Sequence, residues 1–161
     1  MTSAAAPELE VGSLAPDFTL SDDSGATVHL KALRGRTVVL YFYPKDDTPG
    51  CTVEACEFRD ALPRFDAAGA AVYGISPDDV KTHEKFRKKF GLTFPLLADT
   101  EHAVAEKFGV WKEKNMYGRK YMGVERTTFV IDGRGRIAHV FRKVKPQGHA
   151  EAVREAVSGM A

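Results

Sequence analysis

The sequence predicts an α/β sandwich in which helices flank a central mixed β-sheet. Two apolar runs, Thr37–Tyr43 and Ala70–Ile75, are rich in β-branched and aromatic residues and suit strands that are buried on both faces. Segments with helical spacing lie between such strands, which favours parallel pairing. Later in the chain, Asp132-Gly133 separates two strand-like runs and is typical of a hairpin turn. We therefore expect parallel strands first and an antiparallel hairpin later.

An N-terminal hairpin and several shorter elements complete this order. The turn-rich segment Ser21–Gly25 separates Val11–Phe18 from Thr27–Leu30, so a hairpin is expected there. Trp111–Gly123 is polar and aromatic, and a loop is expected. The other expected elements are helices over Pro77–Phe90, Thr100–Phe108 and Gln147–Val157, and strands over Phe94–Leu97, Thr127–Ile131 and Arg136–Phe141. This order of elements is that of a thioredoxin-like fold.

The helix expected after the first buried strand contains both cysteines of the chain. Pro44 ends the strand, Thr48 suits the N-cap position, and Pro49 suits the first helical position. Apolar residues follow at roughly helical spacing, namely Val53, Phe58, Leu62 and Phe65. Pro63 lies inside this pattern and is expected to kink or interrupt the helix.

Length and composition indicate one domain over residues 1–161, with residues 1–8 as a flexible tail. Lys plus Arg (23) nearly balances Asp plus Glu (22), and a net charge of +1 argues against nucleic-acid binding. No apolar run approaches the roughly 20 residues needed to cross a bilayer. Met1–Pro7 has neither the basic nor the apolar region of a signal peptide, so we expect a cytoplasmic protein.

Cys51 is expected to be the third residue of the helix that begins at Pro49. Backbone N–H groups at this end have no acceptor within the helix, and the helix dipole is positive there. Both effects favour a thiolate, which is the nucleophilic form of cysteine. The alternative is a buried, inert cysteine at a helix start.

Peroxide reduction by such a thiolate requires donors near the oxygen that departs, because negative charge grows there. Thr48 supplies a hydroxyl, the Gly50–Cys51 backbone supplies N–H groups, and Gly50 leaves room for a substrate. Pro44 would shield the site from water. Arg126 precedes an expected strand and could supply a guanidinium. The plainer interpretations are that Thr48 only caps the helix, that Pro44 only ends the strand, and that Arg126 forms an ordinary salt bridge.

Cys56 follows Cys51 by five positions. Five helical residues turn by about 500° and rise by about 7.5 Å, which exceeds the roughly 7 Å between Cα atoms that a disulfide tolerates. Either the two sulfurs never bond, or the first helical turns unwind. Because a second thiol protects a sulfenic acid from over-oxidation, our hypothesis is that Cys56 is that thiol.

The segment that contains both cysteines resembles the active-site loop of the peroxiredoxins, specifically the PrxQ or bacterioferritin comigratory protein type. It reads Pro44-Lys-Asp-Asp-Thr48-Pro-Gly-Cys51-Thr-Val-Glu54-Ala-Cys56 and matches the family pattern Pro-x-x-x-Thr-x-x-Cys in full. Further matches are Ala15–Phe18, Phe108–Trp111, Lys114–Gly123 and Arg126–Asp132. Glu54 also matches, but we assign it no chemical role.

This resemblance implies a thioredoxin-like fold with an N-terminal hairpin, and reduction of hydrogen peroxide and organic hydroperoxides without a metal or organic cofactor. It implies that Cys51 attacks peroxide, that Thr48 and Arg126 are activating donors, and that Pro44 shields the site. It also implies that Cys56 resolves the product within one chain, that thioredoxin restores the dithiol, and that the protein is a monomer.

Three other functions fit less well. A disulfide oxidoreductase would carry Cys-x-x-Cys, whereas the spacing here is Cys-x4-Cys. A metal-binding module would need clustered ligands, and the histidines are scattered, so we interpret them as solvated surface residues. They are His29, His83, His102, His139 and His149. Nucleic-acid binding could be argued from Lys81–Lys89 or Trp111–Tyr121, but these suit a solvated helix face and a loop beside the active site.

Overall fold

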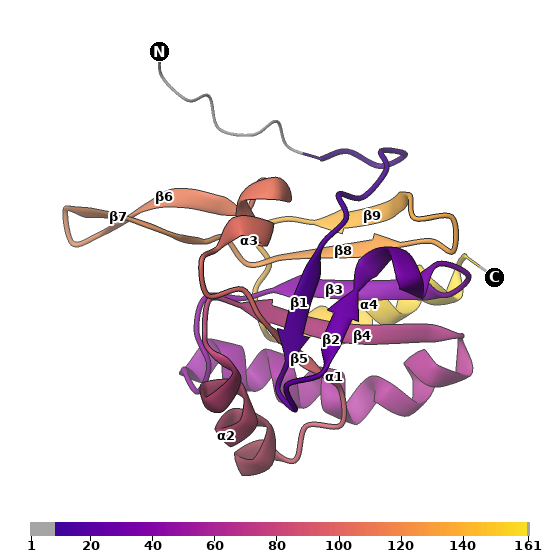
Figure 1. The fold of residues 1–161 in the computed structure, drawn as a ribbon, viewed down its shortest axis with the longest axis horizontal. Coiled ribbons are helices and arrows are strands. Elements are labelled where there is room, and N and C mark those ends of the chain that lie inside the picture. Colours follow the sequence, from indigo (N-terminus) through magenta and orange to yellow (C-terminus); the bar gives the residue numbers. More distant parts are fainter. Residues whose placement is uncertain (1–8, 161) are drawn as a thin grey trace.

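The computed structural model describes residues 9–160 and contains a seven-stranded sheet with the order β2-β1-β5-β4-β3-β8-β9 (Figure 1). A separate two-stranded sheet consists of β6 and β7. The strands are β1 (Thr19–Asp22), β2 (Thr27–His29), β3 (Thr37–Phe42), β4 (Ala70–Ser76), β5 (Leu96–Ala98), β6 (Trp111–Met116), β7 (Arg119–Val124), β8 (Thr127–Ile131) and β9 (Ile137–Phe141). The helices are the 3-10 helix η1 (Leu30–Leu33) and the α-helices α1 (Pro49–Ala67), α2 (Val80–Phe90), α3 (Ala103–Lys107) and α4 (His149–Ser158).

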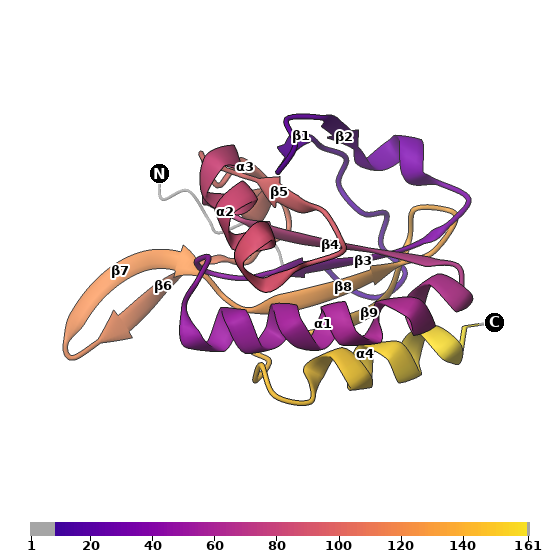
Figure 2. The ribbon, with the colours of Figure 1, turned by 90° about the horizontal axis from the view of Figure 1, so that it is seen from below.

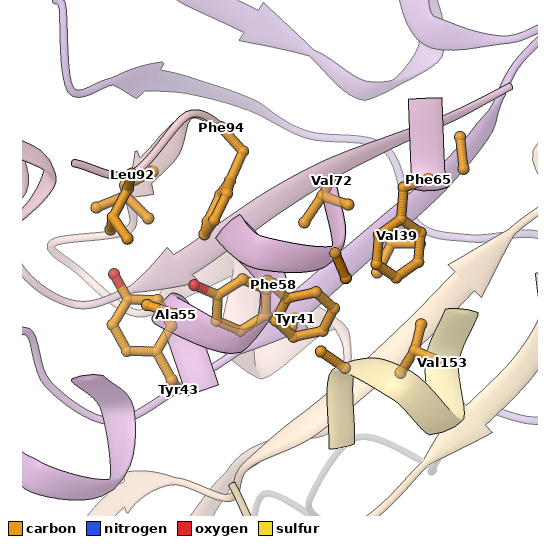
Figure 3. Close-up of a cluster of buried hydrophobic side chains, with 14 of the residues drawn as sticks. Val39, Tyr41, Tyr43, Ala55, Phe58, Phe65, Val72, Leu92, Phe94 and Val153 are labelled. Carbon is orange, nitrogen blue, oxygen red and sulfur yellow. The ribbon is translucent and has the colours of Figure 1, made fainter. Parts of the chain in front are cut away.

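The main sheet is mixed, as the sequence predicts. Strands β3, β4 and β5 are parallel, whereas β8 pairs antiparallel with both β3 and β9. Helices α1 and α4 lie side by side on one face (Figure 2). Aromatic side chains from β3 and α1 interleave between the sheet and this helix layer, with the Tyr41 and Phe58 rings stacked 4.6 Å apart (Figure 3). A second apolar cluster covers the opposite face and includes α3. None of the helices within residues 9–160 is long and apolar enough to cross a membrane.

Trp111–Gly123 is not the loop that we predicted. It forms most of the β6–β7 hairpin, which projects from the body as an arm (Figures 1 and 2). Tyr117 and Gly118 turn the chain with φ angles of 53° and 79°. Two positive φ values suit the right-handed twist of a tight hairpin. Because the arm extends into solvent and buries little, its strands lack the apolar alternation that signals a strand.

The first strand and helix α1 also differ from their predictions, and the other predicted helices and strands differ by at most three residues at their ends. The first strand begins at Thr19, whereas Val11–Phe18 contributes only an isolated bridge at Leu14; Pro16 lacks the N–H that a continuous ladder would need. Helix α1 runs through Pro63 without interruption. Pro63 is exposed, so water can satisfy the carbonyl that its missing N–H leaves free. The predicted tail over residues 1–8 lies outside the described residues.

Candidate active site

The first turn of α1 presents Cys51 at the end of strand β3. Thr48 is the N-cap residue, as predicted, and its carbonyl accepts the first intrahelical bond, from Thr52 N–H at 2.8 Å. The N–H groups of Gly50 and Cys51 therefore have no acceptor within the helix. The Cys51 side chain is buried, and the thiol is free. An anion at this sulfur is favoured by the helix dipole and by these donors.

Arg126 reaches the same sulfur from 75 residues further along the chain. Its Nη2 donates to Cys51 Sγ at 3.3 Å, and its Nη1 donates to Glu54 Oε1 at 2.6 Å. The sheet register explains this approach, because Phe42 pairs with Thr127 and so brings the start of β8 beside the end of β3. One guanidinium thus holds a sulfur and a carboxylate through two separate nitrogens.

Glu54 follows Cys51 by three positions, so both side chains lie on the same face of α1. The Glu54 side chain is fully buried, and its Oε2 has no partner among the described residues. Burial raises the pKa of Glu54 to about 7, against the lowering effect of Arg126. We assigned Glu54 no chemical role from the sequence. Its three-residue spacing from Cys51 is the signal that could have identified it.

The loop before α1, which is the candidate active-site loop, contains Thr48 and Pro44. The Thr48 hydroxyl donates to the Lys45 carbonyl at 2.9 Å rather than capping the helix. Its oxygen keeps lone pairs that can accept a hydrogen bond. Pro44 is half-buried at the end of β3. The space beside Gly50 that we expected to admit a substrate is occupied by Arg126, because a Cβ atom added to Gly50 would lie 3.3 Å from Arg126 Nη2.

Cys56 is half-buried and free, on the same unbroken helix as Cys51. The structure is thus the reduced form, and its helix separates the two thiols as the spacing predicts. By the helical geometry, the two sulfurs lie outside disulfide range.

Residues 11–140 match the family model described as the AhpC/TSA family. The chain belongs to this family. Peroxiredoxin Bcp of Bacillus subtilis is 51% identical over 146 residues, which are 90% of this chain and 93% of that one. A solved structure of the Xanthomonas campestris bacterioferritin comigratory protein has a TM-score of 0.85 and 45% identity, and the match covers 89% of this chain and 91% of that one. A Xylella fastidiosa PrxQ structure has a TM-score of 0.91 and 37% identity, with coverage of 96% and 99%.

These likenesses confirm that the chain is a peroxiredoxin of the Bcp or PrxQ type with a thioredoxin-like fold. Peroxiredoxins are thiol-dependent peroxidases, and the chain is therefore an oxidoreductase.

A buried hydrogen-bonded network anchors the active-site loop of this peroxiredoxin to α2. Tyr43 Oη donates to Asp46 Oδ1 at 2.5 Å, and Asp46 Oδ2 lies 2.6 Å from His83 Nδ1. His83 Nε2 donates to the Leu97 carbonyl at 2.9 Å, because that oxygen can only accept. The Asp46 N–H also donates to Asp78 Oδ2 at 2.8 Å. The side-chain atoms of Asp46, Asp78 and His83 that lie close enough together to bind a metal thus take part in hydrogen bonds with protein groups, and these bonds fix the loop that precedes α1.

Our interpretation of all five histidines as solvated is wrong for two of them. His83 is fully buried on α2, three positions before the buried Phe86, so it lies on the inward face. His149 is buried at the start of α4, where its Nε2 lies 2.7 Å from Thr128 Oγ1. Burial lowers the pKa of His149 to about 4, and the Arg126 charge acts in the same direction.

Glu54 and His149 make opposite contributions to stability as the pH changes. The folded chain holds the Glu54 proton more tightly than the unfolded chain, so this stabilisation is present below pH 4.5 and is lost as the pH rises through about 7. The His149 contribution is present above pH 6.5 and is lost as the pH falls through about 4. The two contributions should largely cancel in the unaltered protein.

Replacing Glu54 with glutamine should remove this cancellation. The free energy of unfolding, measured by urea denaturation, should then rise by about 2 kcal/mol between pH 4.5 and 6.5 relative to the unaltered chain. In the matched His149→Gln variant, the free energy of unfolding should instead fall over the same pH range relative to the unaltered chain. Parallel pH profiles for all three chains would contradict this account.

Proposed function

We propose that this chain reduces hydrogen peroxide and organic hydroperoxides by attack of the Cys51 thiolate. The observation that carries the proposal is the Arg126 guanidinium, 3.3 Å from Cys51 Sγ at a helix N-terminus. The sulfur forms a bond to the terminal peroxide oxygen, and the O–O bond breaks. Its electron pair leaves with the other oxygen, which takes up a proton to give water or an alcohol. Cys51 becomes a sulfenic acid.

Arg126, Thr48 and Pro44 have separate roles in this proposal. Arg126 stabilises the thiolate and the charge that develops on the leaving oxygen. Thr48 binds the peroxide through its hydroxyl. The oxygen can accept the O–H hydrogen of the peroxide while the hydroxyl hydrogen stays on the Lys45 carbonyl. Pro44, half-buried beside the loop, limits access of water to the sulfenic acid.

Cys56 resolves the sulfenic acid within the same chain. Its thiol condenses with the Cys51 sulfenic acid, forming an S–S bond and releasing water. Because an intact α1 keeps the two residues too far apart, its first turns must open for this step. Opening also removes the helix N-terminus that favours the Cys51 anion. One helix therefore alternates between a form suited to peroxide and a form suited to resolution.

A protein dithiol of the thioredoxin type returns the disulfide to two thiols. Its thiolate attacks Cys56, which is less buried than Cys51 in the reduced form, and Cys51 leaves as the thiolate that Arg126 stabilises. The second thiol of the partner then breaks the mixed disulfide and becomes oxidised. The cycle takes place in a cytoplasmic monomer and needs no metal or organic cofactor.

This function is tested by following peroxide consumption with dithiothreitol as a small dithiol reductant. We expect many turnovers per chain with hydrogen peroxide and with an alkyl hydroperoxide. Without reductant, consumption should stop after one equivalent of peroxide. Failure to consume any peroxide in the presence of the dithiol would contradict the proposal.

A further inference from the structure

The β6–β7 arm is not used by the proposed mechanism, yet within residues 9–160 it carries most of the large exposed apolar side chains. Met116 and Tyr117 are 55% and 99% exposed, and Tyr121 and Met122 are 43% and 49% exposed. Tyr and Met are enriched in protein interfaces, and an apolar surface gathered on a projecting hairpin is typical of a binding site. An isolated two-stranded hairpin also gains little stability in water, so folding alone does not explain it.

The two faces of the arm differ sharply in charge. Residues directly opposite one another in an antiparallel pair share a face. One face, which we call the basic face, carries Lys112, Lys114, Met116, Arg119, Tyr121 and Gly123. The opposite face carries Trp111, Glu113, Asn115, Lys120, Met122 and Val124, and on it Lys120 pairs with Glu113 at 3.8 Å. The basic face thus combines three cations with two apolar side chains. Lys112 pairs with Glu125 at 3.0 Å beside the body, so Lys114 and Arg119 supply the remaining positive charge of this face.

The basic face continues to the active site. The pKa of Lys114 is lowered by burial and by the charge of Arg126, whereas Cys51 acts in the opposite direction. Lys114 is therefore within electrostatic range of both catalytic groups. Only Glu125 separates the end of β7 from Arg126. The arm and the first turn of α1 lie at the same end of the molecule in both views (Figures 1 and 2).

We propose that the basic face of the β6–β7 arm is the docking surface for the protein dithiol that reduces the Cys51–Cys56 disulfide. This inference rests on the proposed function, which requires such a partner. A protein whose thiolate reaches the first turns of α1 must cover that end of the molecule, where the arm begins. Charge complementarity calls for a partner with acidic residues around its reactive cysteines, and Tyr121 and Met116 supply apolar contact.

Two variants with the same change in charge, each of which also loses one exposed large apolar side chain, test the two faces against each other. Arg119→Glu/Tyr121→Ser alters the basic face, and Lys120→Glu/Met122→Ser alters the opposite face of the same strand. None of these residues contacts Cys51, Glu54 or Arg126 in the interactions described above. The probe is a thioredoxin of net negative charge, kept reduced by its reductase and NADPH, and dithiothreitol is the small control reductant.

We expect kcat/KM for thioredoxin to fall about tenfold in the basic-face variant and less than about twofold in the opposite-face variant. The loss should shrink at high salt, since screening weakens charge steering. Rates with dithiothreitol should match the unaltered chain in both variants. Equal effects in both variants, or none, would overturn the docking surface while leaving the peroxidase intact.

Two further results would also overturn it. In the first, the unaltered chain sediments as a dimer and the basic-face variant sediments as a monomer. In the second, with dithiothreitol as the reductant, the variant reduces lipid hydroperoxides more slowly but reduces other peroxides at the unaltered rate. These would assign the face to a second copy or to a lipid. An unaltered chain that is inactive with dithiothreitol would refute the proposed function itself, and the docking surface with it.

Discussion

Replacing Cys51 with serine should lower the second-order rate of peroxide reduction by at least about a thousandfold. The reaction needs an anionic nucleophile, and a serine hydroxyl beside Arg126 remains un-ionised at neutral pH. The measurement is the rate of peroxide consumption at pH 7 with excess dithiothreitol. The buried sulfur is small and accepts a hydrogen bond from Arg126, which a serine hydroxyl can also accept, so we expect the variant to fold normally.

The matched control for this change is Cys56→Ser. It leaves Cys51, Arg126 and Glu54 in place, so the first reaction with peroxide should proceed at the unaltered rate. The sulfenic acid should then persist until the small dithiol or a second peroxide reaches it. Retained turnover in Cys51→Ser would refute the assignment of the nucleophile, whatever Cys56 does.

Replacing Arg126 with methionine should lower the same rate by about 10²–10³-fold, because it removes the donor aimed at the reacting sulfur. It should also destabilise the fold by about 3 kcal/mol at pH 8, where Glu54 would remain buried without its counter-charge. Both effects follow from the two contacts of one guanidinium, with Cys51 and with Glu54. Peroxide kinetics and urea denaturation measure them separately.

The double variant Arg126→Met/Glu54→Gln separates catalysis from stability. Removing the Glu54 charge should recover most of the lost stability, because no uncompensated carboxylate remains in the interior. It should recover none of the rate. If the rate returned with the stability, Arg126 would act only by supporting the fold.

Local patterns account for the part of the site that lies within one helix. Thr48 and Pro49 predict where α1 begins, and that alone puts Cys51 in the first turn. The position of Arg126 just before an expected strand made it a candidate, but only the family resemblance favoured it over an ordinary salt bridge. Its approach depends on the register between β3 and β8, which no short segment encodes.

Other features depend on burial, which the local sequence shows less clearly. The sequence around Glu54 and His83 is typical of ordinary polar residues on a helix. In the structure each side chain is fully buried, Glu54 against Arg126 and His83 against Asp46. The β6–β7 arm was missed for the opposite reason. Its strands bury little, so the apolar alternation on which strand prediction relies is absent.

The most direct test of the mechanism is the intact mass of the reduced chain after one equivalent of hydrogen peroxide, followed by peptide mapping. We predict that the mass falls by two hydrogen atoms and that one chain carries a Cys51–Cys56 disulfide. Such a bond cannot form while α1 is wound, so its presence would establish that the helix opens. A chain that instead gains oxygen at Cys51 and keeps Cys56 as a free thiol would contradict resolution by Cys56.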